Sequence, residues 1–182
     1  MNEHVIIAGS GGQGIMLGGK VLAWAGLNRG YKVSWFPAYG AEVRGGAAHC
    51  MVIISSLDIS SPYIDKADAL IAMNEPSLLR FRLRIKAKAL VLINSSLVDI
   101  NKIKRKILNI EDFPFTETAI KLGNIRVSNM VALGAYIAKR GILTKESIFK
   151  AIEEIAPEEK KSLIGINKQA VEEGMKLVMQ SL

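Results

Sequence analysis

A glycine-rich turn near the start of the chain is the first place where the residue types could do chemistry. The stretch "AGSGGQGIM" follows an apolar run and contains the pattern Gly9-x-Gly11-x-x-Gly14, with Gly12 and Gln13 inside it. Glycines at this spacing let the backbone turn sharply and approach a phosphate, and the N-terminus of the next helix offers free N–H groups to an anion. The pattern predicts an anion-compatible turn, in which the amide of Gln13 could also contact a polar ligand or a partner.

A dinucleotide site at this turn would need a carboxylate about 20 residues further on, to hold the ribose hydroxyls. The corresponding segment reads "KVSWFP" and ends in Trp35, Phe36 and Pro37, with neither a carboxylate nor an arginine for a 2′-phosphate. A stand-alone nucleotide-binding protein that uses the 9–14 turn therefore remains only the alternative function. A turn that packs a helix on a strand and binds nothing also stays open.

A second candidate site lies in "PAYGAEVRGGAAHC", where Arg44 precedes Gly45 and Gly46 and Tyr39 offers a ring and a hydroxyl. A cation beside two glycines can form an anion-binding nest with the open backbone N–H groups. Loops that follow parallel strands gather at the same edge of a sheet, so we expect Arg44 near the 9–14 turn. An internal ion pair between Glu42 and Arg44 is the structural alternative.

The next two polar residues, His49 and Cys50, stand at the start of an apolar strand. Neighbours on a strand point to opposite faces, so this pair cannot converge as a nucleophile and its base. One histidine and one cysteine also fall short of a zinc site, and a single cysteine cannot hold an iron–sulfur cluster. We expect Cys50 to be a packed core residue.

The bulk properties indicate a globular chain of 182 residues with 49% apolar residues and a net charge of +7. We expect one domain over residues 1–182. No apolar run reaches the roughly 20 residues of a membrane span. The opening "MNEH" has no charged leader before an apolar core, so the expected location is cytoplasmic.

The basic excess is concentrated in residues 80–106. Its acidic content is Asp99 alone, against nine basic residues: Arg80, Arg82, Arg84, Lys86, Lys88, Lys102, Lys104, Arg105 and Lys106. The first five alternate as on one face of a strand. Only Phe81 interleaves with them, which disfavours nucleic acid as a partner. A solvated face or a docking patch for an acidic partner remain as interpretations.

The pattern of elements predicts an α/β fold: a single three-layer domain with a mostly parallel, Rossmann-like sheet, one β-hairpin insertion and a helical C-terminal third. Strands are expected at 4–8, 32–36, 49–55, 67–73, 89–94 and 107–110, with a return strand of a hairpin from Ile59. Helices are expected at 15–27, from Pro76, at 117–122 after a Thr116 cap, at 129–139, at 145–155 after a Thr144 cap, and near 159–180. The apolar 129–139 helix is either a buried central helix or half of an interface.

Four segments taken together resemble the gamma subunit of 2-oxoacid:ferredoxin oxidoreductases, the pyruvate/ketoisovalerate oxidoreductase gamma domain family. They read "GSGGQGIMLGGKVLAWAG", "WFPAYGAEVRGGAAHCMVIIS", "SPYIDKADALIAMNEPSL" and "LINSSL". The resemblance is close over residues 4 to 97, and the two glycine motifs in combination are more specific than either alone. The Tyr-Gly-x-Glu-x-Arg-Gly-Gly form is most similar to the 2-oxoglutarate branch.

The resemblance implies a subunit of a cytoplasmic complex that oxidatively decarboxylates a 2-oxoacid, reduces ferredoxin and makes an acyl-coenzyme A. Thiamine diphosphate with its magnesium ion would sit on the alpha and beta partner chains, and the iron–sulfur clusters on a beta or delta chain. This chain has neither a Gly-Asp-Gly stretch with a downstream Asn pair nor cluster cysteines. It would therefore supply no catalytic residue and no metal ligand, and would be inactive alone.

The same resemblance implies that the two glycine segments approach coenzyme A, the shared substrate, or a neighbouring subunit. The residues concerned are Gly9, Gly11, Gly12, Gln13, Gly14, Tyr39, Arg44, Gly45 and Gly46. Without its partner chains we expect the protein to form homo-oligomers through exposed apolar surface.

Overall fold

The computed structural model describes residues 1–39, 46–99 and 109–181. Within these ranges six strands form one sheet in the order β2-β3-β1-β4-β5-β6. The neighbours β1, β4, β5 and β6 are parallel, while β3 is antiparallel to both β1 and β2. The strands are β1 Asn2–Ser10, β2 Lys32–Tyr39, β3 Ala47–Ser55, β4 Ala67–Ala72, β5 Ile85–Asn94 and β6 Asn109–Phe113. The mostly parallel sheet is thus confirmed.

The antiparallel strand lies elsewhere than the sequence predicted. Residues 56–66 contain no strand, so the hairpin expected from Ile59 is wrong. The hairpin is formed by β2 and β3, which pair from Lys32 opposite Ser55 to Tyr39 opposite Ala48. The connection between these strands is shorter than the dozen or so residues that a parallel crossover needs, which is the physical reason for the reversal.

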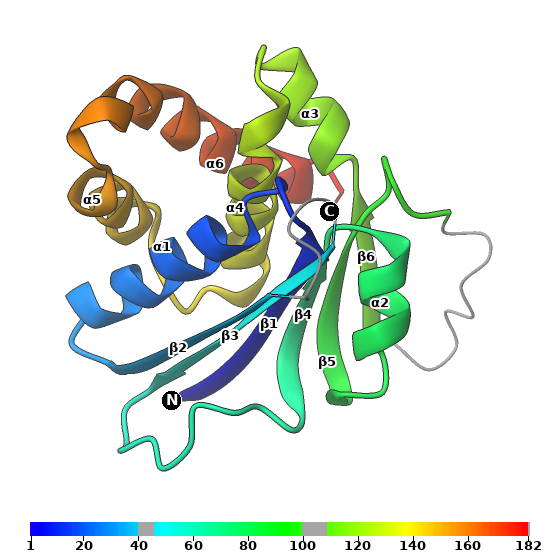
Figure 1. The fold of residues 1–182 in the computed structure, drawn as a ribbon, viewed down its shortest axis with the longest axis vertical. Helices are drawn as coiled ribbons and strands as arrows, with labels where there is room; N and C mark the ends of the chain where they lie inside the picture. Colours follow the sequence, from blue (N-terminus) through cyan, green and yellow to red (C-terminus); the bar gives the residue numbers. More distant parts are fainter. Residues whose placement is uncertain (40–45, 100–108, 182) are drawn as a thin grey trace.

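The helices divide unequally between the two faces of the sheet. Figure 1 shows α1, α4, α5 and α6 on one side and the short α2 on the other, in agreement with the two separate core clusters. The α-helices are α1 Ile15–Asn28, α2 Glu75–Phe81, α3 Phe115–Lys121, α4 Ser128–Arg140, α5 Lys145–Ile155 and α6 Ile164–Met179. Two 3₁₀ segments, η3 Ile125–Val127 and η4 Glu158–Leu163, precede α4 and α6.

The helix ends follow the predicted signals in most cases. The Thr144 side chain accepts a hydrogen bond from Ser147 N–H at the start of α5. Asn74 accepts from Ser77 N–H in the same way at α2, in which Pro76 lies in the first turn. The Thr116 cap is wrong, because α3 already begins at Phe115. Thr116 Oγ1 instead accepts a 2.8 Å hydrogen bond from the amide of Asn94, which is completely buried and must find partners inside the protein.

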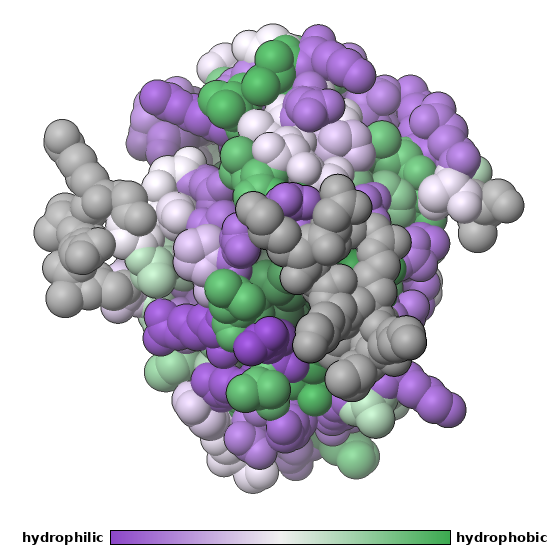
Figure 2. Space-filling view, turned by 90° about the vertical axis from the view of Figure 1, so that its right-hand side faces the viewer, coloured by the Kyte–Doolittle hydropathy of each residue, from purple (hydrophilic) through white to green (hydrophobic). Residues whose placement is uncertain are grey.

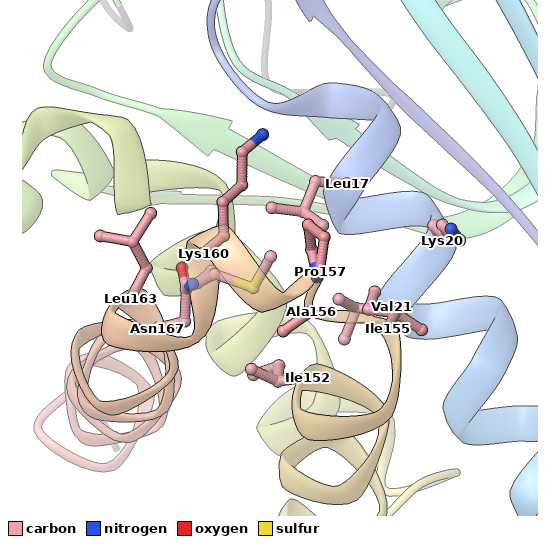
Figure 3. Close-up of a pocket in the computed structure, with 11 residues that line it drawn as sticks. Leu17, Lys20, Val21, Ile152, Ile155, Ala156, Pro157, Lys160, Leu163 and Asn167 are labelled. Atoms are coloured by element: carbon pink, nitrogen blue, oxygen red, sulfur yellow. The ribbon is translucent and has the colours of Figure 1, made fainter.

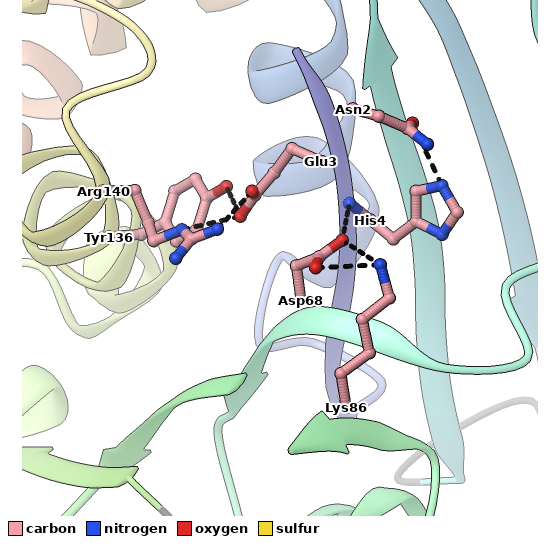
Figure 4. A network of polar contacts seen from close by, with 7 residues as sticks. All are labelled: Asn2, Glu3, His4, Asp68, Lys86, Tyr136 and Arg140. Carbon is pink, nitrogen blue, oxygen red and sulfur yellow. Dashed lines mark hydrogen bonds and ion pairs between the residues drawn. The ribbon is translucent and has the colours of Figure 1, made fainter. Parts of the chain in front are cut away.

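The apolar helix predicted at 129–139 is buried at the centre of the helical layer. Ten residues of α4, from Ser128 to Ile137, are inaccessible to solvent or nearly so, which confirms the buried interpretation. At its end α4 is tied to the first strand. The buried carboxylate of Glu3 accepts hydrogen bonds from Tyr136 Oη at 3.1 Å and from Arg140 Nε at 2.8 Å (Figure 4). Burial and the adjacent Glu3 charge hold the pKa of Tyr136 well above its usual value.

The first part of the basic segment is not one face of a strand, contrary to the prediction. Arg80 lies in α2 and Arg82 follows it as its C-cap, whereas Lys86 and Lys88 lie in β5. Arg84 stacks on Tyr63 and donates a hydrogen bond to Ile64 O, so it holds the chain of residues 56–66 against α2. Lys86 pairs with Asp68 at 2.8 Å (Figure 4). Lys102, Lys104, Arg105 and Lys106 lie outside the described residues.

The side of the molecule that carries α2 has a mixed surface. Figure 2 shows hydrophobic residues among hydrophilic ones on this side. Leu79 and Leu83 remain 52% and 75% exposed there, next to the basic side chains of α2. Over the described part of the chain, no helix is both long enough and apolar enough to cross a membrane.

Candidate anion-binding site at the carboxyl edge of the sheet

The 9–14 turn connects the end of β1 to the start of α1. Gly12 and Gly14 have φ angles of 93° and 70°, in the left-handed region that favours glycine. Gln13 folds back into the turn, where its Oε1 accepts a 2.7 Å hydrogen bond from Ser10 N–H. The amide oxygen of Gln13 therefore closes the turn.

Two glycines of the turn are also required by close neighbours. A Cβ atom at Gly9 would lie 2.5 Å from Gln13 Oε1 and 3.0 Å from Met73 Cβ at the end of β4. A Cβ atom at Gly14 would lie 2.5 Å from Asn129 Nδ2, which donates a 2.9 Å hydrogen bond to Gly14 O. The turn is thus held by β4 on one side and by α4 on the other, while Gly11 and Gly12 stay exposed.

The N-terminus of α1 has the electrostatics of an anion site. Its cap is Gly14, with no side-chain hydrogen bond to the first turn and no acidic residue there. The partial positive charge of a 14-residue helix is therefore not neutralised locally by the described residues. The turn is therefore compatible with an anion, and the binding of one there stays a prediction.

The second glycine segment reaches the same edge of the sheet. Gly11 N–H donates a 2.9 Å hydrogen bond to the carbonyl oxygen of Gly46, so the last residue of the second segment lies against the turn. Tyr39, the last residue of β2, is 73% exposed and free to contact a partner molecule. Arg44 and Gly45 lie outside the described residues, so the proximity of Arg44 to the turn stays a prediction.

A pocket of about 190 Å³ opens beside the turn on the α2 side of the sheet. It is lined by Gly9 and Ser10 of β1, by the first residues of β3 and by α2. Asn74 joins the elements, because its Nδ2 donates a 2.7 Å hydrogen bond to Ser10 Oγ while its Oδ1 caps α2. The pocket is therefore built on the same edge as the anion-compatible turn.

The pocket brings in two residues that sequence reasoning did not assign to this site. His49 packs its ring on Phe81 with the centroids 4.8 Å apart, and Arg80 lies over the same phenylalanine ring. Burial, and then the positive charges of Arg80 and Arg84, lower the pKa of His49. The site thus offers a guanidinium and a neutral imidazole at neutral pH. The alternation of side chains along β3 predicted that His49 and Cys50 point to opposite faces of the sheet. The neighbours of His49 could not be predicted, because they depend on where α2 packs.

Cys50 lies on the other face of β3, against α1, as expected. Its thiol is completely buried and donates a weak hydrogen bond to Ile15 O at 3.5 Å. Burial raises the pKa of Cys50 to about 12, so the thiol stays protonated and unreactive at neutral pH. In the parts of the chain that the structure describes, no group of three or more His, Cys, Asp or Glu side chains could hold a metal ion.

We expect the His49→Gln variant to lose part of the pH dependence of folding. The pKa of His49 is lowered in the folded protein, so the unfolded chain binds more protons below its pKa of about 6.5. The contribution of neutral His49 to stability is full above about pH 6.5 and is lost as the pH falls toward the lower folded value. Thermal melts between about pH 7 and pH 5 should therefore be flatter for the variant. The His4→Gln variant should show the same kind of flattening, because burial also lowers the pKa of His4. Parallel curves for His49→Gln and the unaltered protein would contradict the expectation.

Comparison with known proteins shows which family the chain resembles. The family described as pyruvate ferredoxin/flavodoxin oxidoreductase matches residues 4–177. The 2-oxoglutarate synthase subunit KorC of Methanocaldococcus jannaschii is 34% identical, with 92% of each chain covered. The ketoisovalerate oxidoreductase subunit VorA of Methanothermobacter marburgensis is 35% identical over 94% of this chain, which spans only 35% of the length of that relative.

A solved structure has the same fold from end to end. The gamma subunit of a keto/oxoacid ferredoxin oxidoreductase from Geobacter sulfurreducens matches with a TM-score of 0.82 and 28% identity, covering 98% of this chain and 99% of the other. A stand-alone nucleotide-binding protein, the alternative function, finds no support among these relatives. The chain belongs to the pyruvate ferredoxin/flavodoxin oxidoreductase family.

Proposed function

We propose that this chain is a single-domain gamma subunit of a multi-subunit 2-oxoacid:ferredoxin oxidoreductase, of the 2-oxoglutarate type. The enzyme decarboxylates the 2-oxoacid oxidatively, passes electrons to ferredoxin and forms an acyl-coenzyme A. The near full-length match to a 2-oxoglutarate synthase subunit supports the assignment. The observation that carries the role of the chain is the Gly11–Gly46 hydrogen bond, which joins the two glycine segments into one edge.

The chain's own residues bind and orient, and the bond-breaking chemistry belongs to groups on partner chains. Coenzyme A carries phosphates, which suit the N-terminus of α1 and the exposed Gly11 and Gly12. Tyr39, Arg44 and Gly45 are the further residues that we propose contact coenzyme A or a neighbouring subunit. Gln13 and Asn129 have a positioning role, because their hydrogen bonds fix the turn from inside.

The isolated chain is expected to be colourless and inactive with every 2-oxoacid. Its cysteine is buried and protonated, and its sequence has no stretch for thiamine diphosphate. The measurement is acceptor reduction by the purified chain with thiamine diphosphate, magnesium and coenzyme A added, beside the same assay on the complex purified from the producing organism. Oxidative decarboxylation by the chain alone would refute the proposed division of labour.

In the assembled complex, Arg44→Ala should weaken the use of coenzyme A or the binding of the chain to its partners by a decade or more. Loss of one member of a buried charged contact typically costs about 2–5 kcal/mol, and a decade corresponds to about 1.4 kcal/mol. Melting of the isolated chain should hardly change, since surface ion pairs contribute about 0–1 kcal/mol. Arg126→Ala, at an exposed arginine of η3, is the matched control. A large fall in melting temperature with normal turnover would make Arg44 a clamp for its own loop.

A further inference from the structure

A second and larger pocket lies within the helical layer, on the face of the sheet opposite to α2. It is a groove of about 380 Å³ between α1, α5, η4 and α6. Val21, Met130 and Ile152 line it and are buried, so it has an apolar floor that belongs to the main core. Figure 3 shows the groove with the lining residues of α5 and η4 on one side and Leu17 and Val21 of α1 on the other.

The wall of the groove formed by η4 is not anchored in the core. The 3₁₀ segment η4 has no buried residue, and it bridges α5 and α6 across the groove. Leu163 at its end and Leu17 on the opposite wall both line the groove, yet they remain 40% and 42% exposed. Exposed aliphatic side chains that continue an apolar floor form the kind of contiguous patch that interaction sites present.

The mouth of the groove carries two uncompensated positive charges. Lys20 of α1 and Lys160 of η4 line it from opposite sides, and neither has a hydrogen-bond or ion-pair partner among the described residues. Neighbouring lysines are paired: Lys161 with Glu158 at 2.6 Å and Lys168 with Glu153 at 2.5 Å. Glu159 is exposed on η4 but does not line the groove.

The apolar floor, the exposed leucines and the two lysines together discriminate between three kinds of molecule that could cover the groove. A second copy of this chain seated through the same groove would place its own Lys20 and Lys160 against these two lysines, positive charge onto positive charge. A small apolar molecule would fill the floor but would leave the leucines of the rim in water. A protein segment with apolar side chains and adjacent carboxylates satisfies the floor, the rim and both lysines.

We propose that the groove between α1, α5, η4 and α6 docks a segment of a partner subunit that carries apolar side chains flanked by Asp or Glu. The inference rests on the proposed function, since it requires a complex of several chains. It adds a second surface, which shares α1 with the glycine turn and is completed by α5, η4 and α6. The partner's apolar side chains cover Val21 and Ile152, and its carboxylates pair with Lys20 and Lys160.

The first test compares the isolated chain with the complex purified from the producing organism through a tag on this chain. Acetylation of lysines with N-hydroxysuccinimidyl acetate is read by mass spectrometry. Lys20 and Lys160 should react at least tenfold more slowly in the complex. A carbodiimide, which joins amines to carboxylates in direct contact, should link Lys20 or Lys160 to Asp or Glu residues of another subunit.

The second test reverses the charge at the mouth. The double variant Lys20→Glu with Lys160→Glu should bind the partner chains at least tenfold more weakly. Its melting temperature should stay unchanged, because both lysines are exposed and unpaired among the described residues. The matched control, Lys121→Glu with Arg126→Glu, makes the same change in net charge at two exposed residues near the end of α3.

The outcomes separate this inference from the proposed function. A complex that forms normally while Lys20 and Lys160 react as fast as in the isolated chain overturns the docking groove and leaves the subunit role intact. Cross-links from these lysines only to a second copy of this chain overturn it as well. If no other chain accompanies the tagged protein, the proposed function fails and the inference falls with it.

Discussion

Gly174→Ala is expected to lower the free energy of unfolding by about 3 kcal/mol or more, because α4 and α6 touch through their backbones. A Cβ atom at Gly174 would lie 1.9 Å from Val131 O, and one at Gly134 would lie 2.0 Å from Val171 O. Both clashes are with backbone atoms of the facing helix, so no side chain can rotate away. The two helices must separate, which opens the core around α4.

Urea or thermal unfolding of Gly174→Ala and Gly134→Ala measures this effect. Gly165→Ala is the control on the same helix, since a Cβ atom there meets nothing within 4 Å. That change removes a glycine from a helix and should stabilise by about 0.5–1 kcal/mol. Equal melting temperatures for Gly174→Ala and Gly165→Ala would show that the helices can separate at little cost.

This crossing illustrates what a sequence can and cannot predict. The helix at 129–139 was expected to be buried because it is apolar on nearly all sides, and α4 is buried. The pairing of Gly134 with Val171 and of Gly174 with Val131 was not expected. It depends on which helices meet and on the rotation of each about its axis, and neither periodicity nor capping encodes that information.

The sheet shows the same division between local and long-range information. Apolar runs and turn residues predicted the strands, since these signals act over a few neighbouring residues. The reversal of β3 was missed, although the short connection after Tyr39 carries the signal. Ile59 was wrongly given a return strand because "SSLDISSP" favours a turn, whereas the chain of residues 56–66 is held by Arg84 and Tyr63 without pairing.

The candidate site was predictable to the extent that it depends on parallel strands. β1 and β2 point the same way, as the prediction required, but the Gly11–Gly46 hydrogen bond itself continues the antiparallel pairing of β1 with β3, in which Ser10 lies opposite Ala47. His49 and Arg80 were not predicted there, because they come together only through the packing of α2 on β3. The sequence allowed the Gln13 amide to contact a polar ligand or a partner, which stays a prediction; it did not reveal that the amide oxygen accepts a hydrogen bond from Ser10 N–H within the turn.

Gly19→Ala is the second substitution with a large expected effect, because α1 packs on β3 at this residue. A Cβ atom at Gly19 would lie 2.3 Å from Cys50 Sγ and 3.1 Å from Trp35 Nε1. Cys50 is completely buried, so its sulfur has little room to move. Overpacking of this kind costs about 1–3 kcal/mol, and relief by movement of α1 would displace the glycine turn from Gly46.

A double-mutant cycle with Cys50→Ala identifies the cause of this loss. Removing the sulfur opens space for the new methyl group, so the double variant should be more stable than the sum of the single effects by about 1–3 kcal/mol. Gly18→Ala is the control one residue away, where a Cβ atom would meet only Asn129 Cβ, at an ordinary 3.8 Å. Urea unfolding of the unaltered chain, the two single variants and the double variant gives the coupling free energy.

Additive effects would mean that the sulfur does not set the distance between α1 and β3. A coupling in the expected range would mean that the one cysteine of this chain acts as a spacer, which holds the N-terminus of α1 at the edge where the two glycine segments meet.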